Sequence, residues 1–270
     1  MATADAVFTG SIPAIYEEYL VPLLFEPYAE DIAQRLADVR TGVVLELAAG
    51  TGAVTRALLK ALAPAVRIIA TDLNEAMLRQ GETHANGASV TWQQADAQKL
   101  PFEDATVDAV VCQFGVMFMP DKLLAYREAL RVLRPGGRYV FNVWGSLQDN
   151  EMSDVVTRAV ASVFPQDPPR FFARTPFGYH DADVIRHELA SAGFADIEIE
   201  TVDKVSRAPS AAHVALGLCK GTPLRGEIEA RAAARLDEVT DVAAEALTAR
   251  FGASAFDNCM RAKVATAYRR

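Results

Sequence analysis

Strand-length apolar segments alternate with helix-length amphipathic segments along most of this chain. Alternation at this spacing predicts parallel strands joined by right-handed helical crossovers, with helices on both faces of the sheet. Segment 194–202 alternates apolar and acidic residues, which indicates a strand with one solvated face near the sheet's edge. We therefore expect an α/β fold with a doubly wound, mostly parallel, seven-stranded sheet. The expected strands are 42–47, 66–72, 89–96, 106–114, 138–144, 194–202 and 260–270, and the expected helices between them are 52–63, 74–85, 121–133 and 181–192.

This alternation is interrupted by segments that we expect to cover the sheet as an added helical cap. Residues 145–180 combine an amphipathic piece with the proline-rich "PQDPPRFFARTPFGYH". Residues 222–251 carry apolar side chains at helical spacing, as one long helix or two short ones. The expected organisation is 1–40 as N-terminal covering helices, 41–144 as ligand-binding core, 145–180 as cap segment, 181–204 as core helix and strand, 205–257 as helical cap insertion and 258–270 as closing strand.

Composition narrows the classes of partner. The net charge of −8 at pH 7 would repel a polynucleotide, so we expect no nucleic acid. Cys112, Cys219 and Cys259 are odd in number and widely spaced, as in proteins of a reducing cytoplasm. Apolar runs are strand-sized and the first residues lack a signal-peptide pattern, so we expect a cytoplasmic protein with no membrane span. No cluster of His, Cys, Asp and Glu has metal-ligand spacing, so we expect no metal; monomer and homodimer both stay open.

Small residues and acids mark the carboxyl ends of the first three strands. Ala48, Gly50 and Gly52 remove side-chain bulk at the first turn from strand to helix, so that a ligand can lie against backbone amides. Parallel sheets bind ligands at this edge, beside the first strand. Asp72 and Asp96 close the next two strands, and Asp72 is placed to accept hydrogen bonds from ribose hydroxyls. The pattern predicts a nucleoside-containing ligand.

A nicotinamide dinucleotide uses the same geometry and is the rival ligand. Its fingerprint is Gly-x-Gly-x-x-Gly, whereas Gly50-Thr51-Gly52 is followed by "AVT". The carboxylate of Glu46, directly before this turn, would repel a pyrophosphate and suits a cationic amine or sulfonium. An NAD-dependent oxidoreductase is therefore the less favoured interpretation.

Four segments resemble the class I S-adenosylmethionine-dependent methyltransferases, in particular the type 11 group with its ubiquinone/menaquinone methyltransferase-like enzymes. These segments are "VLELAAGTG", "ATDLNEAML", "QQADAQKLPFEDATVDAVVCQF" and "EALRVLRPGGRYVF", in order between residues 42 and 144. The resemblance implies a Rossmann-like sheet with S-adenosyl-L-methionine as the cofactor. Ala48 departs from the pattern, since the family often has glycine there.

The resemblance also implies roles for individual residues. Glu46 would orient the methionine end of the cofactor, the backbone from Ala48 to Gly50 would pass under it, and Asp72 would accept the ribose hydroxyls. The other expected neighbours of the cofactor are Leu73 and Met77 beside the adenine, Asp96, Ala97 and Gln98 at the adenine edge, Gln113, Phe114 and Met117 beside the sulfonium, and Tyr16 from the N-terminal helices.

The expected activity is methyl transfer by in-line displacement to a small, partly apolar molecule. The chain has "CQFGVMFMP" where enzymes that methylate amides and base amines usually carry Asn/Asp-Pro-Pro-Tyr/Phe, which disfavours those acceptors. The aromatic residues of 171–179 would supply an apolar wall, and His180 is the candidate for a general base. A non-catalytic sensor or partner module that binds S-adenosylmethionine is the alternative.

Overall fold

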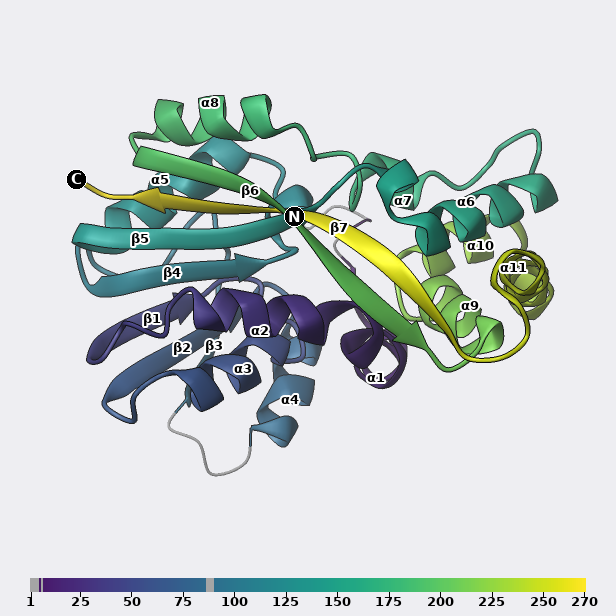
Figure 1. Ribbon diagram of the computed structural model, residues 1–270, viewed down its shortest axis with the longest axis horizontal. Coiled ribbons are helices and arrows are strands. Elements are labelled where there is room, and N and C mark those ends of the chain that lie inside the picture. The colour runs from purple at the N-terminus through teal and green to yellow at the C-terminus, as the bar shows by residue number, and fades with distance from the viewer. Residues whose placement is uncertain (1–4, 6, 86–89) are drawn as a thin grey trace.

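The computed structural model describes residues 5, 7–85 and 90–270, and its centre is a seven-stranded sheet (Figure 1). The strand order is β3-β2-β1-β4-β5-β7-β6. Strands β1 to β5 pair in parallel, and β7 runs antiparallel to both of its neighbours. The predicted fold class is thereby confirmed, with the alternating strand at the sheet's edge. The strands are β1 Gly42–Glu46, β2 Val66–Asp72, β3 Val90–Gln94, β4 Val107–Gln113, β5 Leu133–Trp144, β6 Ala195–Ala208 and β7 Phe256–Tyr268.

Helices cover both faces of this sheet because the strands are apolar on both sides. Helices α2 (Glu26–Gln34) and α3 (Ala53–Ala61) bury Ile32 and Leu58 against one face. Helices α5 (Lys122–Val132) and α8 (Ala182–Ala192) bury Tyr126 and Leu189 against the other. Helix α4 (Glu75–His84) packs beside β2 and β3. The expected strand 89–96 begins partly outside the described residues, which resume at Val90.

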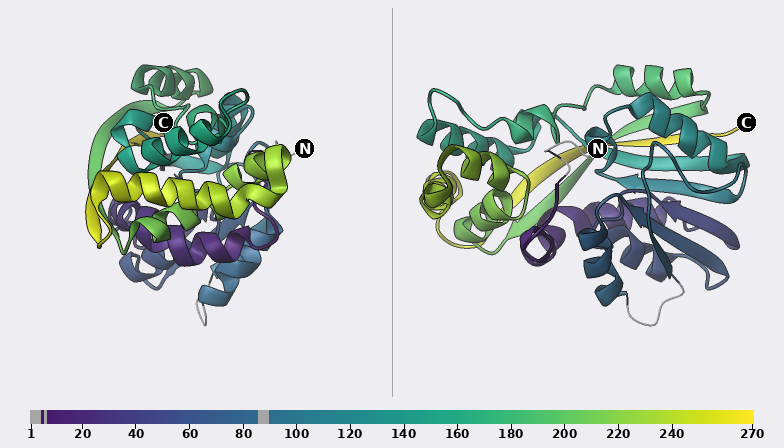
Figure 2. Two further views of the ribbon diagram at one scale, coloured as in Figure 1. Left: turned by 90° about the vertical axis from the view of Figure 1, so that its right-hand side faces the viewer. Right: turned by 180° about the vertical axis from the view of Figure 1, so that it is seen from behind.

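The other helices gather beyond the carboxyl ends of the parallel strands, on one side of the molecule (Figure 2). At the N-terminus, α1 (Ile12–Ile15) leads through the π-helix η2 (Tyr16–Phe25) into α2. The remaining helices are α6 (Glu151–Val163), α7 (Phe171–Arg174), α9 (Ala211–Lys220), α10 (Leu224–Ala232) and α11 (Leu236–Phe251), with short 3₁₀ turns at 116–118, 147–149 and 233–235. Of the two arrangements open for residues 222–251, the structure has two helices rather than one.

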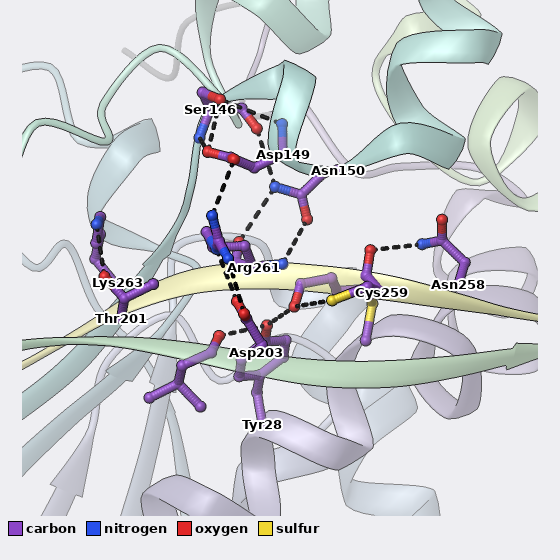
Figure 3. A network of polar contacts seen from close by, with 12 residues as sticks. Tyr28, Ser146, Asp149, Asn150, Thr201, Asp203, Asn258, Cys259, Arg261 and Lys263 are labelled. Carbon is purple, nitrogen blue, oxygen red and sulfur yellow. Dashed lines mark hydrogen bonds and ion pairs between the residues drawn. The ribbon is translucent and has the colours of Figure 1, made fainter.

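Strands β6 and β7 are longer than expected and form an antiparallel pair that runs past the rest of the sheet (Figure 1). The pairing of β5 with β7 ends at Trp144 and Ala262, whereas β6 and β7 stay paired as far as Ala208 and Phe256. Pairing between the two strands thus continues where a third strand is absent, and this outer part carries helices α9 to α11. The Tyr28 hydroxyl of α2 shares its hydrogen between the carbonyl oxygens of Val202, at 3.1 Å, and Met260, at 2.9 Å. This contact connects the N-terminal helices to the pair of strands β6 and β7 (Figure 3). Within the described residues no helix is long and apolar enough to cross a membrane.

Candidate functional site

A cavity of about 180 Å³ lies at the carboxyl ends of β1, β2 and β4, beneath the helices of the cap. The turns after β1 and β4 contribute Ala48 and Phe114 to its wall, and the last residue of β2 contributes Asp72. Helix α6 and strand β7 contribute Ser153 and Asn258. A narrower cavity of about 20 Å³ is lined by Glu46 and Thr51 and shares five lining residues with the larger one. The shared residues are Tyr16, Phe25, Ala48, Gly50 and Gln113.

Four residues with positive φ angles lie at this edge of the sheet. Ala48 and Phe114 follow β1 and β4 with φ angles of +51° and +49°, in the left-handed region that costs a non-glycine residue roughly 1 kcal/mol or more. Gly50 and Gly52 adopt +56° and +84° at lower cost. A Cβ on Gly52 would lie 2.8 Å from the Trp92 ring, so this position requires glycine for space as well. Strain of this kind persists where a site fixes the backbone path.

Asp72 is the central acid of the site. Its carboxylate is 8% exposed, and it accepts hydrogen bonds from the backbone amides of Gly50, at 2.9 Å, and Asn74, at 2.7 Å. Burial raises the pKa of this carboxyl above its usual range. Each carboxylate oxygen accepts more than one hydrogen bond, so both keep capacity for donors in the cavity. A pair of vicinal hydroxyls is the kind of donor that fits.

Glu46 lies at the narrow cavity and is 1% exposed. Burial raises its pKa to about 8, although Thr55 donates a hydrogen bond of 2.5 Å to it. Thr51 and Gln113 line the same cavity, and Thr51 Oγ1 and Gln113 Oε1 are buried beside it without a hydrogen-bond partner in the described part of the chain. An ammonium group carries several hydrogens and one positive charge. It would satisfy such oxygens and favour the ionised form of Glu46.

The third part of the site combines an apolar face with a carboxylate. Leu73 lines the cavity although 41% of it is exposed, and Met77 lies beside it. Asp96, Ala97 and Gln98 line the same region. The amide of Gln98 donates to Asp96 Oδ1 at 2.9 Å, which fixes the carboxylate. A flat heterocycle with exocyclic amino hydrogens is complementary to these groups.

Nine aromatic side chains surround the rest of the cavity in a closed series, which we call the aromatic cage. Successive ring centroids lie 3.7 to 6.3 Å apart, with Phe114 and Trp144 stacked at 3.7 Å. Every member lines the cavity. The cage comprises Phe8, Tyr16, Phe25, Phe114, Trp144, Phe177, Phe172, Phe171 and Phe118.

The structure brings most of the residues predicted from the sequence to these two cavities. Glu46 faces only the narrow one, and Gly52, Met117 and His180 line neither. His180 Nδ1 lies 2.9 Å from the Phe177 carbonyl oxygen. Among the further residues that line the larger cavity and were not predicted from the sequence are Phe8, Phe25, Trp144, Ser153 and Asn258. Only Trp144 carried a usable signal, because it ends a predicted parallel strand.

The sheet order, the small-residue turn and the carboxylates at two strand ends define a nucleoside-cofactor enzyme of the doubly wound α/β class. Residues 44–137 match the family model described as a methyltransferase domain. The ubiquinone/menaquinone biosynthesis C-methyltransferase UbiE of Pseudomonas aeruginosa is 32% identical over 173 residues, which cover 59% of this chain and 68% of that protein. Its counterpart from Saccharophagus degradans is 29% identical over 203 residues, 70% of this chain and 76% of the relative. The chain belongs to the class I S-adenosylmethionine-dependent methyltransferases, type 11 group, and its cofactor is S-adenosyl-L-methionine.

Solved structures share the fold at lower identity. The YcgJ protein of Bacillus subtilis has a TM-score of 0.59 and 18% identity, over 90% of this chain and 99% of its own. A phosphoethanolamine N-methyltransferase of Haemonchus contortus, solved with phosphomonomethylethanolamine and S-adenosylhomocysteine, has a TM-score of 0.61 and 16% identity, over 96% of this chain and 56% of its own. At this identity the likeness concerns the fold alone.

Proposed function

We propose that this methyltransferase transfers the methyl group, by in-line displacement, to a small, partly apolar molecule that carries a flat ring. The aromatic cage is the observation that carries this proposal. It surrounds the cavity next to the cofactor residues, and aromatic walls bind flat apolar groups by area burial and by stacking.

The cofactor roles fit the groups described above. Glu46, with the unpartnered oxygens of Thr51 and Gln113, would hold the amino end of the methionine part, and Asp72 would hold the ribose hydroxyls. Leu73, Met77, Asp96, Ala97 and Gln98 would hold the adenine, and Tyr16, Gln113 and Phe114 would lie near the sulfonium. The bound cofactor supplies an activated methyl group. The chain's contribution is then alignment in a water-excluding site, which accounts for roughly 7 to 11 kcal/mol in well-oriented reactions.

Charge in the cavity favours an uncharged or apolar acceptor over a phosphorylated one. The described lining residues include two carboxylic acids, Asp72 and Asp96, which lie with the cofactor residues, and no lysine, arginine or histidine. A phosphate would meet no cation there and would be repelled by the two carboxylates. Within the described part of the chain no imidazole or amine lines the cavity, so we expect an acceptor atom that is nucleophilic without such a base. An electron-rich ring carbon meets this requirement: its bond to the methyl group forms as the methyl–sulfur bond of the cofactor breaks, and the ring then loses the proton of that carbon to water. The relatives are named as C-methyltransferases, in keeping with a carbon acceptor.

We infer from the three unpaired cysteines a reducing cytoplasm and from the net charge that nucleic acid is not a substrate.

Turnover with two opposed acceptors tests the proposal. We expect 1,4-naphthohydroquinone to yield a methylated product by mass spectrometry, with one S-adenosylhomocysteine formed per product, and phosphoethanolamine to yield none. Phe172→Ala and Phe177→Ala should each lower kcat/KM for the ring compound about ten-fold without weakening S-adenosylhomocysteine binding. Phe251→Ala is the matched control, since Phe251 stacks on Phe256 outside the cavity. Methylation of phosphoethanolamine at a comparable kcat/KM would overturn the proposal.

A further inference from the structure

Two polar atoms in the acceptor part of the cavity have no partner. Ser153 and Asn258 are 7% and 6% exposed, and both line the cavity. The Asn258 amide nitrogen donates to the Cys259 carbonyl oxygen at 2.9 Å, whereas its Oδ1 has no hydrogen-bond partner within residues 7–85 and 90–270 (Figure 3). The Ser153 hydroxyl also has no hydrogen-bond partner among these residues. Both atoms keep some exposed surface, and both residues line the cavity.

The neighbouring polar side chains of the cap are already engaged. Thr222 donates to the Leu218 carbonyl oxygen at 2.8 Å. Asn150 donates to the carbonyl oxygens of Ser146, at 3.0 Å, and Arg261, at 3.2 Å, and accepts from the Arg261 amide at 3.1 Å. These groups keep the cap together and have little capacity for a ligand. The unpartnered pair therefore differs from the other buried polar groups around it.

The bonds of Asn150 connect the two elements that carry the pair. They tie the first residues of α6 to β7 at Arg261, and Arg261 in turn bonds Asp203 of β6 at 2.8 Å (Figure 3). Ser153 lies one helical turn after Asn150, and Asn258 lies three residues before Arg261. Both residues thus lie on a helix and a strand that hydrogen bonds hold together, rather than on a loop. A fixed, unpartnered polar group in an apolar site is suited to select its ligand.

We propose that Asn258 and Ser153 determine acceptor specificity by binding a hydroxyl group on the ring-bearing acceptor. This inference rests on the proposed function and names the substrate class more closely. Asn258 Oδ1 only accepts hydrogen bonds, whereas the Ser153 hydroxyl both donates and accepts. A ligand hydroxyl also donates and accepts, so it meets either requirement. An acceptor with a methyl ether in this place leaves Asn258 Oδ1 buried and unpaired, which is the arrangement that sites of this kind reject.

Equilibrium dialysis with three probes tests the proposal on the protein saturated with S-adenosylhomocysteine. The probes are naphthalene, 2-naphthol and 2-methoxynaphthalene. We expect 2-naphthol to bind about five- to thirty-fold more tightly than the methyl ether, the factor of one buried hydrogen bond. Asn258→Leu and Ser153→Ala should each reduce this preference while keeping the affinity for naphthalene. Ser162→Ala is the matched control on α6, because that hydroxyl donates to the Ala159 carbonyl oxygen away from the cavity.

Failure of the two proposals is distinguishable in this experiment. If naphthalene does not bind the wild-type protein, the apolar acceptor of the proposed function is wrong. If naphthalene binds and 2-naphthol has no advantage, or the advantage persists in Asn258→Leu and in Ser153→Ala, the specificity pair is wrong. S-adenosylhomocysteine affinity and the far-ultraviolet circular dichroism of each variant show whether it folds. If Asn258→Leu fails to fold, Asn258→Asp replaces it. The carboxylate of that variant still accepts hydrogen bonds, so it should keep the preference for 2-naphthol.

Discussion

The Cβ of Ala48 occupies the space that a side chain at Gly115 would need. A Cβ placed on Gly115 would lie 2.5 Å from the Ala48 Cβ and 2.7 Å from Cys112 Sγ. Ala48 follows β1 and Gly115 follows β4, so the two turns that line the cavity pack directly on each other. Ala48 itself has a left-handed backbone, with a φ angle of +51°.

We expect Gly115→Ala to destabilise the protein by about 1–3 kcal/mol, the usual cost of an extra methyl group in a packed place. Ala48→Gly in the same chain should recover part of that loss, because it removes one of the two clashing atoms. Chemical denaturation of the single and double variants gives the coupling energy. Gly226→Ala is the control, since nothing lies within 4 Å of a Cβ there and the residue is helical. Additive effects at positions 48 and 115 would contradict the direct contact.

Asp72→Ala should weaken S-adenosylhomocysteine binding by roughly ten- to several-hundred-fold, because charge-assisted hydrogen bonds to the ribose would be lost. The same change removes the acceptor of the Gly50 and Asn74 amides, so we also expect a loss of stability, in contrast to a freely exposed acid at the rim. Asp72→Asn keeps one carbonyl oxygen, so its affinity for S-adenosylhomocysteine should lie between those of the wild type and Asp72→Ala. Calorimetric titration measures the affinities.

Asp104→Ala serves as the control for this charge change, because Asp104 is a surface partner of Arg131 with 74% of its side chain exposed. The affinity of the Asp104→Ala variant for S-adenosylhomocysteine should equal that of the wild type. Unchanged affinity in Asp72→Ala, or wild-type binding of NAD without S-adenosylhomocysteine binding, would contradict the assignment of the ribose site.

The parallel core was predictable because each strand and helix carries its own hydrophobic period. The acids were predictable as well, since Glu46, Asp72 and Asp96 lie at or just after the ends of predicted parallel strands, where ligands bind. The extension of β6 and β7 past the sheet was not predictable, because it depends on pairing between two strands that are distant in the sequence. Nothing in residues 203–208 alone indicates that 256–261 will lie beside them.

The acceptor part of the site was the least predictable for the same reason. The aromatic cage draws Phe8 and Phe25 from the N-terminus, Trp144 from β5 and Phe177 from the cap. Each of these residues has the pattern of ordinary core in its local segment. Only the tertiary arrangement shows that they face one cavity and that Asn258 adds a polar atom to it.

His180→Ala should leave the rate of methyl transfer within about two-fold of the wild type. The imidazole lines neither cavity, and its Nδ1 is engaged with the Phe177 carbonyl oxygen at 2.9 Å. Initial rates of S-adenosylhomocysteine formation with 1,4-naphthohydroquinone measure the effect. A fall in kcat of about a hundred-fold, with unchanged KM and unchanged fold, would instead make His180 the general base.

The affinity for S-adenosylhomocysteine should increase as the pH rises from 6 to 8. In the free protein, burial holds the pKa of Glu46 at about 8, so the carboxyl is largely protonated below that pH. The ammonium of the ligand favours the ionised carboxylate, and binding below pH 8 therefore releases a proton. Titration in two buffers of different ionisation enthalpy detects that proton. In Glu46→Gln we expect weak binding that releases no proton from this site, and equal proton release in both proteins would contradict the assignment.

Glu46 should also lower the stability of the protein without cofactor as the pH rises. Its pKa is about 8 in the folded chain, against the ordinary glutamate pKa of 4.5 in an unfolded chain, so the folded state holds the extra proton between these values. The stability that this proton contributes is complete below pH 4.5 and is lost as the pH rises toward 8. Each unit of raised pKa corresponds to about 1.4 kcal/mol. At pH 7.5 we therefore expect cofactor-free Glu46→Gln to unfold at a higher temperature than the wild type, with the difference vanishing near pH 5. A lower melting temperature for the variant at both pH values would contradict this prediction, because it would show that the Glu46 side chain stabilises the cofactor-free fold.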